Sequence, residues 1–256
     1  EAARNHIQII GRLANGYNTP ARAVSPEWTA TLSPDDYLAD MDRYARAVVQ
    51  RYGQTVKYWA MENELNIDYL HVWLGWRAHA WDPEVKDRIV EVLNRAIHES
   101  AAGTHSILTI STFPPYESYL KHMTARVNYD IMGLYSYPAN FLPISRGFEN
   151  STCKSATVAR QNNGNRPVIW IETGYQTTGS IRTPQQQAQY VSSVTRAALR
   201  AGMRGVFIYE YLDNPQEQLT REQHFGLLQA DRTPKPAWTA YGKLIAQYRQ
   251  SAPPSP

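Results

Sequence analysis

Short apolar runs alternate with amphipathic helical segments along almost the whole chain, and this rhythm limits the fold more than any other feature. Most of the apolar runs are continuous rather than alternating, as expected for parallel strands that are buried on both faces. The candidate strands are His6–Leu13, Val56–Met61, Ser106–Ser111, Tyr129–Ser136, Pro167–Glu172 and Gly205–Tyr211. Repeated strand-then-helix units predict a parallel α/β fold, either an open sheet or a barrel.

The helical segments between these runs begin and end at recognisable residues. Ser33 and Thr183 are each followed by proline, which is typical of an N-cap and the first helical position. Gly53 and Gly202 follow the last apolar positions of the same two helices. Two further helices are predicted, one carrying Val85, Ile89, Val92, Leu93, Ala96 and Ile97 and stopped by Gly103, the other running from about Ala237 to Tyr248.

Two features favour a barrel over an open sheet. A dinucleotide-binding sheet needs a glycine-rich phosphate turn after its first strand, and none follows His6–Leu13. Several strands also end in charged or aromatic residues, where a barrel builds its active site. A complete TIM (β/α)8 barrel has eight strands. We therefore expect residues 1–249 to form strands three to eight of a barrel whose first two βα units lie on an upstream segment, with residues 250–256 as a Pro/Ser-rich tail or linker.

Composition and residue spacing give no support to several functional classes. The net charge of +3 gives no reason to expect a nucleic-acid partner. No apolar run approaches the roughly 20 residues of a membrane span, and a single cysteine cannot form an internal disulfide. The seven histidines show no metal-ligand spacing, so we expect neither a metal nor a cofactor. A secreted or periplasmic location is expected if a signal peptide lies upstream, and the oligomeric state stays open.

Two glutamates at strand ends are the main candidates for chemistry. Val56–Met61 is followed by Glu62, Asn63 and Glu64, and the run from Pro167 ends at Glu172. Any one such glutamate is more often solvated or salt-bridged. Glu64 and Glu172 are 108 residues apart, about three βα units, which places them on the fourth and seventh strands of a barrel. Glycoside hydrolysis needs two such carboxylates, one protonated and one ionised.

The same segments resemble the clan A glycoside hydrolases. The resemblance rests on Asn63-Glu64 after a strand that contains Trp59, and on a later strand that ends Glu172-Thr173-Gly174. It implies a retaining (β/α)8 enzyme in which Glu64 is the acid/base, Glu172 the nucleophile and Asn63 a ligand of the sugar 2-hydroxyl. Families 39 and 53 and cellulase-like members look most similar, because of Tyr209-Glu210-Tyr211, His224–Leu228 and the Thr-Pro-Lys-Pro-Ala run that starts at residue 233.

The sixth strand both follows the family pattern and departs from it. Tyr135-Ser136-Tyr137 resembles the His-x-Tyr of the clan, which implies that Tyr137 faces the nucleophile. Tyr135 stands where the clan has histidine. The clan's strand-two arginine, which steadies the nucleophile, would lie in the upstream part. Weak turnover by this chain alone is therefore one expected consequence.

Several residues keep two interpretations. Glu62 rivals Glu64 as the acid, although the neighbouring Asn63 favours Glu64. Glu210 and Asp213 each either contact substrate or form a structural salt bridge. Trp73 and Trp76 belong to an aromatic loop after Glu64 that forms either sugar-stacking acceptor subsites or a packed cluster. The candidate substrate-binding residues are Asn63, Tyr137, Tyr135, Trp73, Trp76 and Glu210.

The sequence therefore predicts a retaining β-glycoside hydrolase that cleaves a β-linked oligo- or polysaccharide by double displacement. The alternative is a catalytically weak or inactive carbohydrate-binding barrel. The two hypotheses share a carbohydrate partner and differ in whether Glu172 forms a covalent bond with it.

Overall fold

The computed structural model describes residues 2–5, 7–14, 18–19, 22–23, 31–69, 78–141, 148–178, 181–217, 220 and 222–251. Six parallel strands form one sheet, and their order in it is the order in which they occur along the chain. They are β1 (Ile10–Leu13), β4 (Tyr58–Met61), β5 (His105–Ser111), β6 (Ile131–Tyr135), β7 (Val168–Thr173) and β8 (Val206–Ile208). The short strands β2 (Asn18–Thr19) and β3 (Arg22–Ala23) pair antiparallel by themselves. The predicted α/β architecture of parallel strands separated by helices is confirmed.

Helices separate the strands, as the sequence predicts. The α-helices are α1 (Pro34–Tyr52), α3 (Lys86–Ser100), α4 (Tyr116–Arg126), α5 (Pro138–Phe141), α6 (Phe148–Asn162), α7 (Pro184–Arg200) and α8 (Pro236–Ser251). Single 3-10 turns are η1 (Ala3–Asn5), η3 (Leu65–Ile67), η4 (His79–Trp81) and η5 (Glu222–His224). Within the described ranges, no helix is long and apolar enough to cross a membrane.

The chain divides into two compact units. The first unit comprises residues 1–135 and 158–169, and the second comprises residues 136–157 and 170–256. The division falls within α6 and β7. The segment that follows β4, with Glu64, belongs to the first unit, and Glu172 belongs to the second.

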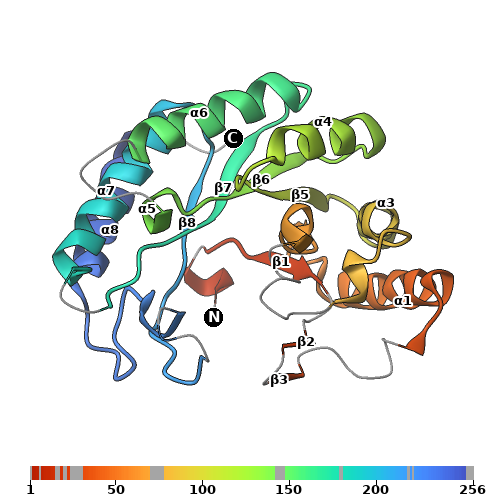
Figure 1. Ribbon diagram of the computed structural model, residues 1–256, viewed down its shortest axis with the longest axis horizontal. Coiled ribbons are helices and arrows are strands. Elements are labelled where there is room, and N and C mark those ends of the chain that lie inside the picture. The colour runs from red at the N-terminus through yellow and green to blue at the C-terminus, as the bar shows by residue number, and fades with distance from the viewer. Residues whose placement is uncertain are drawn as a thin grey trace. The chain divides into compact units, whose positions relative to one another are not determined.

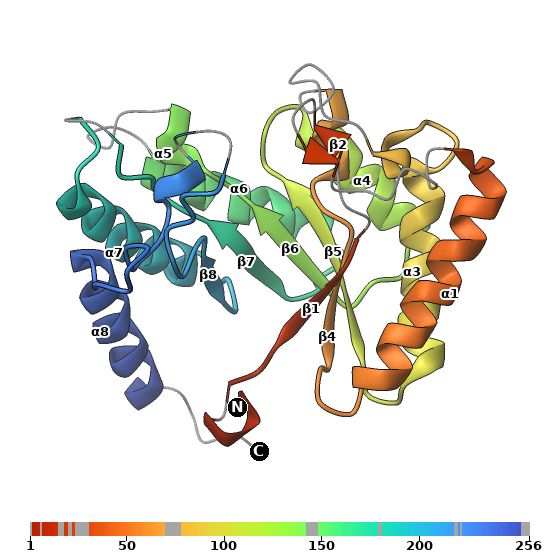
Figure 2. The same cartoon turned by 90° about the horizontal axis from the view of Figure 1, so that it is seen from below.

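In the first unit, α1 and α3 lie side by side next to the strands (Figure 1). Figure 2 shows both helices on one side of β1, β4 and β5. Every residue of β5 after its first is buried, which is the pattern of a parallel strand covered on both faces. The apolar stripes meet there: α1 buries Tyr37, Leu38, Met41, Ala45 and Val49, and α3 buries Ile89, Val90, Leu93, Ala96 and Ile97.

The predicted helix starts are confirmed. The Ser33 side chain accepts a hydrogen bond from the Asp36 N–H at 3.2 Å. Thr183 and Gln186 form a reciprocal capping box. Gly53 ends α1 for a reason other than a left-handed cap, because its φ is −63°. A Cβ at Gly53 would lie 2.5 Å from the Val49 carbonyl oxygen and 2.6 Å from the Ala101 Cβ, so the close approach of the chain requires glycine there.

In the second unit, α7 and α8 pack side by side next to β8 (Figure 2). Both outer strands are shorter than predicted. The ladder between β7 and β8 shifts register between Trp170 and Thr173 and then ends at Ile208. Strand β1 begins only at Ile10, because its single partner, β4, begins at Tyr58. Backbone pairing with a neighbouring strand therefore decides where β1 begins and where β8 ends. The apolar content of a strand does not reveal this pairing.

Candidate active site

In the first unit, the chain turns sharply after β4. Glu62 and Glu64 both have left-handed backbone conformations, with φ of 57° and 48°. Such a conformation costs a residue with a side chain about 1–2 kcal/mol, so the surroundings must hold it. Glu62 is 1% exposed, whereas Glu64 is partly exposed. Because the strand has already ended at Met61, strand alternation does not decide between the two glutamates, and Glu64 is the more accessible carboxylate.

Hydrogen bonds from the neighbouring strands hold this turn. The Glu62 N–H donates to the Leu13 carbonyl at 2.9 Å. The Thr109 hydroxyl of β5 donates to the Met61 carbonyl, also at 2.9 Å. The Arg12 guanidinium of β1 donates to Asn63 Oδ1 at 3.1 Å. This last contact engages the amide oxygen of Asn63 and so sets which way round the amide lies beside Glu64.

In the second unit, Glu172 is the penultimate residue of β7 and is partly exposed. The Tyr137 hydroxyl donates a hydrogen bond to Glu172 Oε1 at 2.6 Å. The Ser136 N–H donates to the Glu172 carbonyl at 3.0 Å, so the backbone and the side chain of Glu172 are both held from the same segment. A short hydrogen bond donated to a carboxylate stabilises its ionised form, which is the form that a nucleophile requires.

Aromatic rings hold Tyr137 in place. Its ring meets Phe225 edge-on at 5.7 Å and Tyr209 at 6.4 Å between centroids, and Tyr209 and Phe225 are 5.4 Å apart. Edge-to-face arrangements of this kind are favourable. Tyr135, in contrast, is only 2% exposed at the end of β6 in the first unit. Of the two tyrosines in the predicted Tyr-x-Tyr segment, Tyr137 contacts Glu172 and Tyr135 is part of the core.

Glu210 follows β8 in the second unit and has an unusual environment. Its Oε1 atom is buried and has no hydrogen-bond partner within the described part of the chain. Burial and the neighbouring carboxylates raise the pKa of Glu210 from its ordinary 4.5 to about 7. Burial contributes most, followed by Glu217, Asp213, Glu222 and Glu172. The structural salt bridge that the sequence left open is absent from the described contacts of Glu210.

This raised pKa predicts that stability depends on pH. Glu210 binds its proton more tightly in the folded state than in the unfolded state. Its contribution to the free energy of unfolding is therefore complete below about pH 4.5 and is lost as the pH rises through 7. Glutamine has no proton to lose, so the free energy of unfolding of Glu210→Gln minus that of the wild type should rise as the pH increases. After allowance for partial exposure, we expect this difference to grow by about 1–2 kcal/mol from pH 5 to pH 8. Urea unfolding at both pH values measures the gain, and an equal difference at pH 5 and pH 8 would contradict it.

Asp213 forms the salt bridge that was one of its two interpretations. Lys235 Nζ lies 2.7 Å from Asp213 Oδ1, and both side chains are largely buried. Lys235 also donates to Thr177 Oγ1 at 3.0 Å, and the Gly226 N–H donates to Asp213 Oδ1 at 2.8 Å. This network fixes the loop that follows β8 to the segments that precede α8.

Removing one partner of this pair should cost much stability. We expect Lys235→Met to lower the free energy of unfolding by about 3–5 kcal/mol, because it leaves the Asp213 charge buried without its partner. Arg88→Met provides the matched control: it breaks the ion pair with Asp35, whose side chains are 49% and 81% exposed, and should cost at most about 1 kcal/mol. Urea unfolding compares the two, and similar losses would show that the buried pair is not a structural anchor.

Trp73 and Trp76 lie among residues 70–77, outside the described residues, so their two interpretations stay open. Two other aromatic residues of the same loop are described. Tyr69 is 47% exposed and donates to the Pro114 carbonyl at 2.7 Å. Trp81 is 6% exposed and therefore packed. Among the described residues, no group of three or more His, Cys, Asp or Glu side chains could hold a metal ion.

Sequence reasoning missed Arg12, Thr109 and Asn66, which hold the turn around Glu64. Each contacts a segment at least 45 residues away in the chain. Arg12 and Thr109 did leave a signal, because each is a polar residue inside a largely apolar strand. Which partner they reach depends on strand pairing, and a single sequence does not contain that pairing.

Comparison with known proteins yields the fold. No family model matches the chain, and no curated protein matches it in sequence. Solved structures do match, and these neighbours are clan A glycoside hydrolases with the TIM fold. A GH5_18 variant from Streptomyces cattleya, solved with Manβ1-4GlcNAc, superposes with a TM-score of 0.78 at 17% identity over 100% of this chain and 66% of its own.

Two other families give the same result. The Ignisphaera aggregans GH53 catalytic domain matches with a TM-score of 0.71 at 12% identity, over 94% of this chain and 74% of its own. A family 39 glycoside hydrolase from Bacteroides cellulosilyticus WH2 matches with a TM-score of 0.67 at 17% identity, over 96% of this chain and 52% of its own. The chain spans slightly less than two thirds of the length of the GH5_18 structures, at 66% and 65%. The chain thus has the fold of these glycosidases.

Proposed function

We propose that this chain carries the catalytic glutamates of a retaining β-glycoside hydrolase, with Glu172 as nucleophile and Glu64 as acid/base. One observation carries the proposal: in a fold shared with glycosidases, Tyr137 donates a 2.6 Å hydrogen bond to the carboxylate that ends β7. Glu64 supports it from the end of β4, where it is partly exposed in a held turn. A glycosidase needs two such carboxylates in unlike surroundings.

The reaction would proceed in two displacements. Glu172 attacks the anomeric carbon while the bond to the leaving oxygen breaks, and Glu64 donates a proton to that oxygen. Glu64 then removes a proton from water, whose oxygen attacks the same carbon and releases Glu172. Two inversions give net retention, and Glu64 regains its proton. Tyr137 would hold one oxygen of Glu172 throughout, leaving the other to attack.

The substrate would be a β-linked oligo- or polysaccharide. A structural neighbour was solved with a β-linked disaccharide, Manβ1-4GlcNAc. Asn63, whose amide oxygen is engaged by Arg12, would contact the sugar 2-hydroxyl. Glu210, whose pKa is raised to about 7, would form a hydrogen bond with a sugar hydroxyl. Trp73 and Trp76 would stack on acceptor sugars, whereas the buried Tyr135 would not contact the substrate directly.

Covalent labelling tests the proposal. The chain is assayed with a panel of aryl β-glycosides and is incubated separately with the matching 2-deoxy-2-fluoro glycosides. The labelled protein is then digested, and the masses of its peptides are measured by mass spectrometry. We expect hydrolysis of at least one aryl glycoside and a fluorosugar on the peptide that contains Glu172. Sugar binding without hydrolysis or label would instead identify a carbohydrate-binding barrel, and label on another carboxylate would overturn the assignment of Glu172.

A further inference from the structure

Asn66 lies two residues after Glu64, and its side chain is tied to strand β5. It is 8% exposed, so solvent does not compete for its amide. Asn66 Nδ2 donates to the Ser111 carbonyl at 2.8 Å, and the Ser111 N–H donates back to Asn66 Oδ1 at 2.8 Å. Both groups of the amide are thereby used on one backbone residue, which fixes the position of Asn66 and the plane of its amide.

The contact between Asn66 and Ser111 extends the pairing of β4 with β5 beyond the last backbone pair. Strands β4 and β5 pair residue by residue up to Met61 opposite Leu108. Strand β5 goes on to Ser111, whereas the chain after Met61 leaves the strand in the turn around Glu64. The Asn66 amide then offers Ser111 the donor and acceptor that a neighbouring strand would have offered. The far side of the turn is thus fixed to the same strand as its near side, where Thr109 holds Met61.

We propose that Asn66 is a positioning residue that holds Glu64 where it can transfer a proton to the leaving oxygen. Glu64 immediately precedes η3 with a φ of 48°, and the Ile67 N–H donates to the Glu64 carbonyl at 3.0 Å. A left-handed residue persists only when its surroundings fix it. On one side of Glu64 the chain is held by Thr109, and on the other by Asn66. Loss of the Asn66 side chain removes two hydrogen bonds that tie the η3 turn to β5, and we expect Glu64 to shift as a result.

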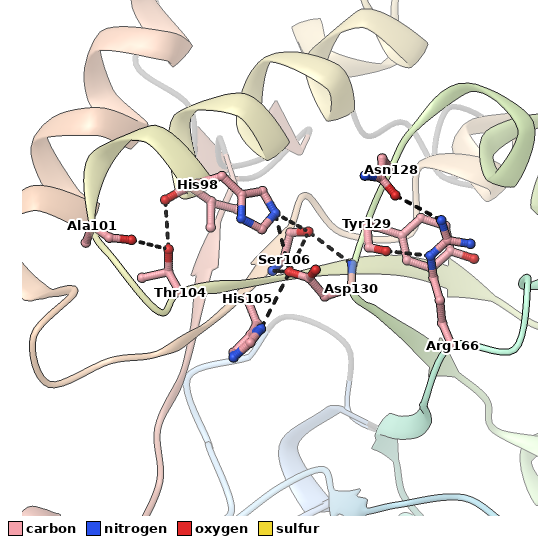
Figure 3. A network of polar contacts seen from close by, with 10 residues as sticks. His98, Ala101, Thr104, His105, Ser106, Asn128, Tyr129, Asp130 and Arg166 are labelled. Atoms are coloured by element: carbon pink, nitrogen blue, oxygen red, sulfur yellow. Dashed lines mark hydrogen bonds and ion pairs between the residues drawn. The ribbon is translucent and has the colours of Figure 1, made fainter.

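Strand β5 supplies a matched control at its other end. There the Ser106 N–H donates to Asp130 Oδ2 at 2.8 Å, again a side-chain acceptor on a backbone N–H of β5. Figure 3 shows Asp130 beside Ser106, with His98 and His105 close by. Removing the Asn66 side chain costs β5 its two hydrogen bonds at Ser111, and removing the Asp130 side chain costs it the bond at the Ser106 N–H together with the contacts to His98 and His105. Only Asn66 is connected to the turn that carries Glu64.

The experiment compares leaving groups, and it rests on the proposed function. Wild type, Asn66→Ala and Asp130→Ala are assayed for kcat/KM on a methylumbelliferyl and a dinitrophenyl glycoside of the same sugar. The dinitrophenolate departs without a proton, so a misplaced acid affects it little. A 1 Å displacement of a catalytic group can cost about 100-fold. We expect Asn66→Ala to lose about 10- to 100-fold on the poor leaving group and under about 3-fold on the dinitrophenyl glycoside.

Each outcome has one meaning. An equal loss on both substrates, or the same leaving-group dependence in Asp130→Ala, would overturn the role of Asn66 while leaving the proposed function intact. Both glycosides carry a sugar that the wild type hydrolyses in the aryl-glycoside panel, and a wild type that hydrolyses no member of that panel would instead overturn the proposed function. If Asn66→Ala does not fold, as judged by urea unfolding, Asn66→Asp replaces it. That variant keeps the size and the acceptor for the Ser111 N–H but loses the donor, and the same dependence on leaving group is expected.

Discussion

Glu172→Ala should lower kcat on every glycoside by about 10⁵-fold, because removal of a nucleophile removes the covalent step itself. The fold should survive, since Glu172 is partly exposed and the Ser136 N–H bonds to its backbone carbonyl, which alanine retains. Steady-state rates and the urea midpoint of the same preparation measure the two effects. Added azide should restore part of the turnover of an activated glycoside and give the glycosyl azide of opposite configuration, because azide attacks from the space that the carboxylate leaves.

Tyr137→Phe is the companion variant. It keeps the ring that packs on Tyr209 and Phe225 but removes the hydroxyl that donates to Glu172. We expect a loss of roughly 10- to 100-fold in kcat, since one charge-assisted hydrogen bond is worth about 1.5–3 kcal/mol. Normal activity in Glu172→Ala would end the assignment of the nucleophile. Normal activity in Tyr137→Phe alone would show only that the hydroxyl is dispensable.

Glu64→Ala should give the second largest effect, and its size should depend on the leaving group. On a methylumbelliferyl glycoside we expect kcat/KM to fall by about 10²- to 10⁴-fold, the usual contribution of a general acid. On a dinitrophenyl glycoside kcat/KM should change little, whereas kcat should fall because hydrolysis of the glycosyl-enzyme lacks its base. A plot of log kcat/KM against the pKa of the leaving phenol, steep for the variant and shallow for the wild type, is the measurement.

Glu62→Gln is the control for the rival carboxylate. Glu62 is 1% exposed and two residues from Glu64, and glutamine keeps its size without its charge. The steep plot should appear for Glu64→Ala and be absent from Glu62→Gln. If Glu62→Gln instead gave the leaving-group dependence, the roles assigned to the two glutamates would have to be exchanged.

The elements of the fold follow from local features that one sequence contains. Ser33 and Thr183 mark helix starts because an N-cap side chain needs only its own next turn. The β5 strand is visible as a continuous apolar run because it is buried on both faces. Strand limits are less accessible, since β1 and β8 end where a neighbour stops pairing, and that neighbour is far away in the chain.

The candidate site divides in the same way. Glu64 and Glu172 could be singled out because they lie at or just beyond the ends of recognisable strands, and Tyr137 because its segment resembles the clan A pattern. The partners Arg12, Thr109 and Asn66 could not, because their contacts depend on which strands are adjacent and in what register. The environment of Glu210 could not be predicted either, because burial and four neighbouring carboxylates raise its pKa, and both arise only on folding.

Side-chain contacts at both ends of strand β5 specify its register in the sheet. Asp130 binds the N–H of Ser106 near its start, and Asn66 binds both backbone groups of Ser111 at its end. Five residues separate these points, so a slip of one position would exchange the inward and outward faces and mismatch both contacts together. A misaligned sheet would deprive the Ser106 N–H, both backbone groups of Ser111 and the Asn66 amide of these hydrogen bonds. Only one register of β5 therefore forms the side-chain hydrogen bonds at both of its ends, and alternative registers are disfavoured during folding.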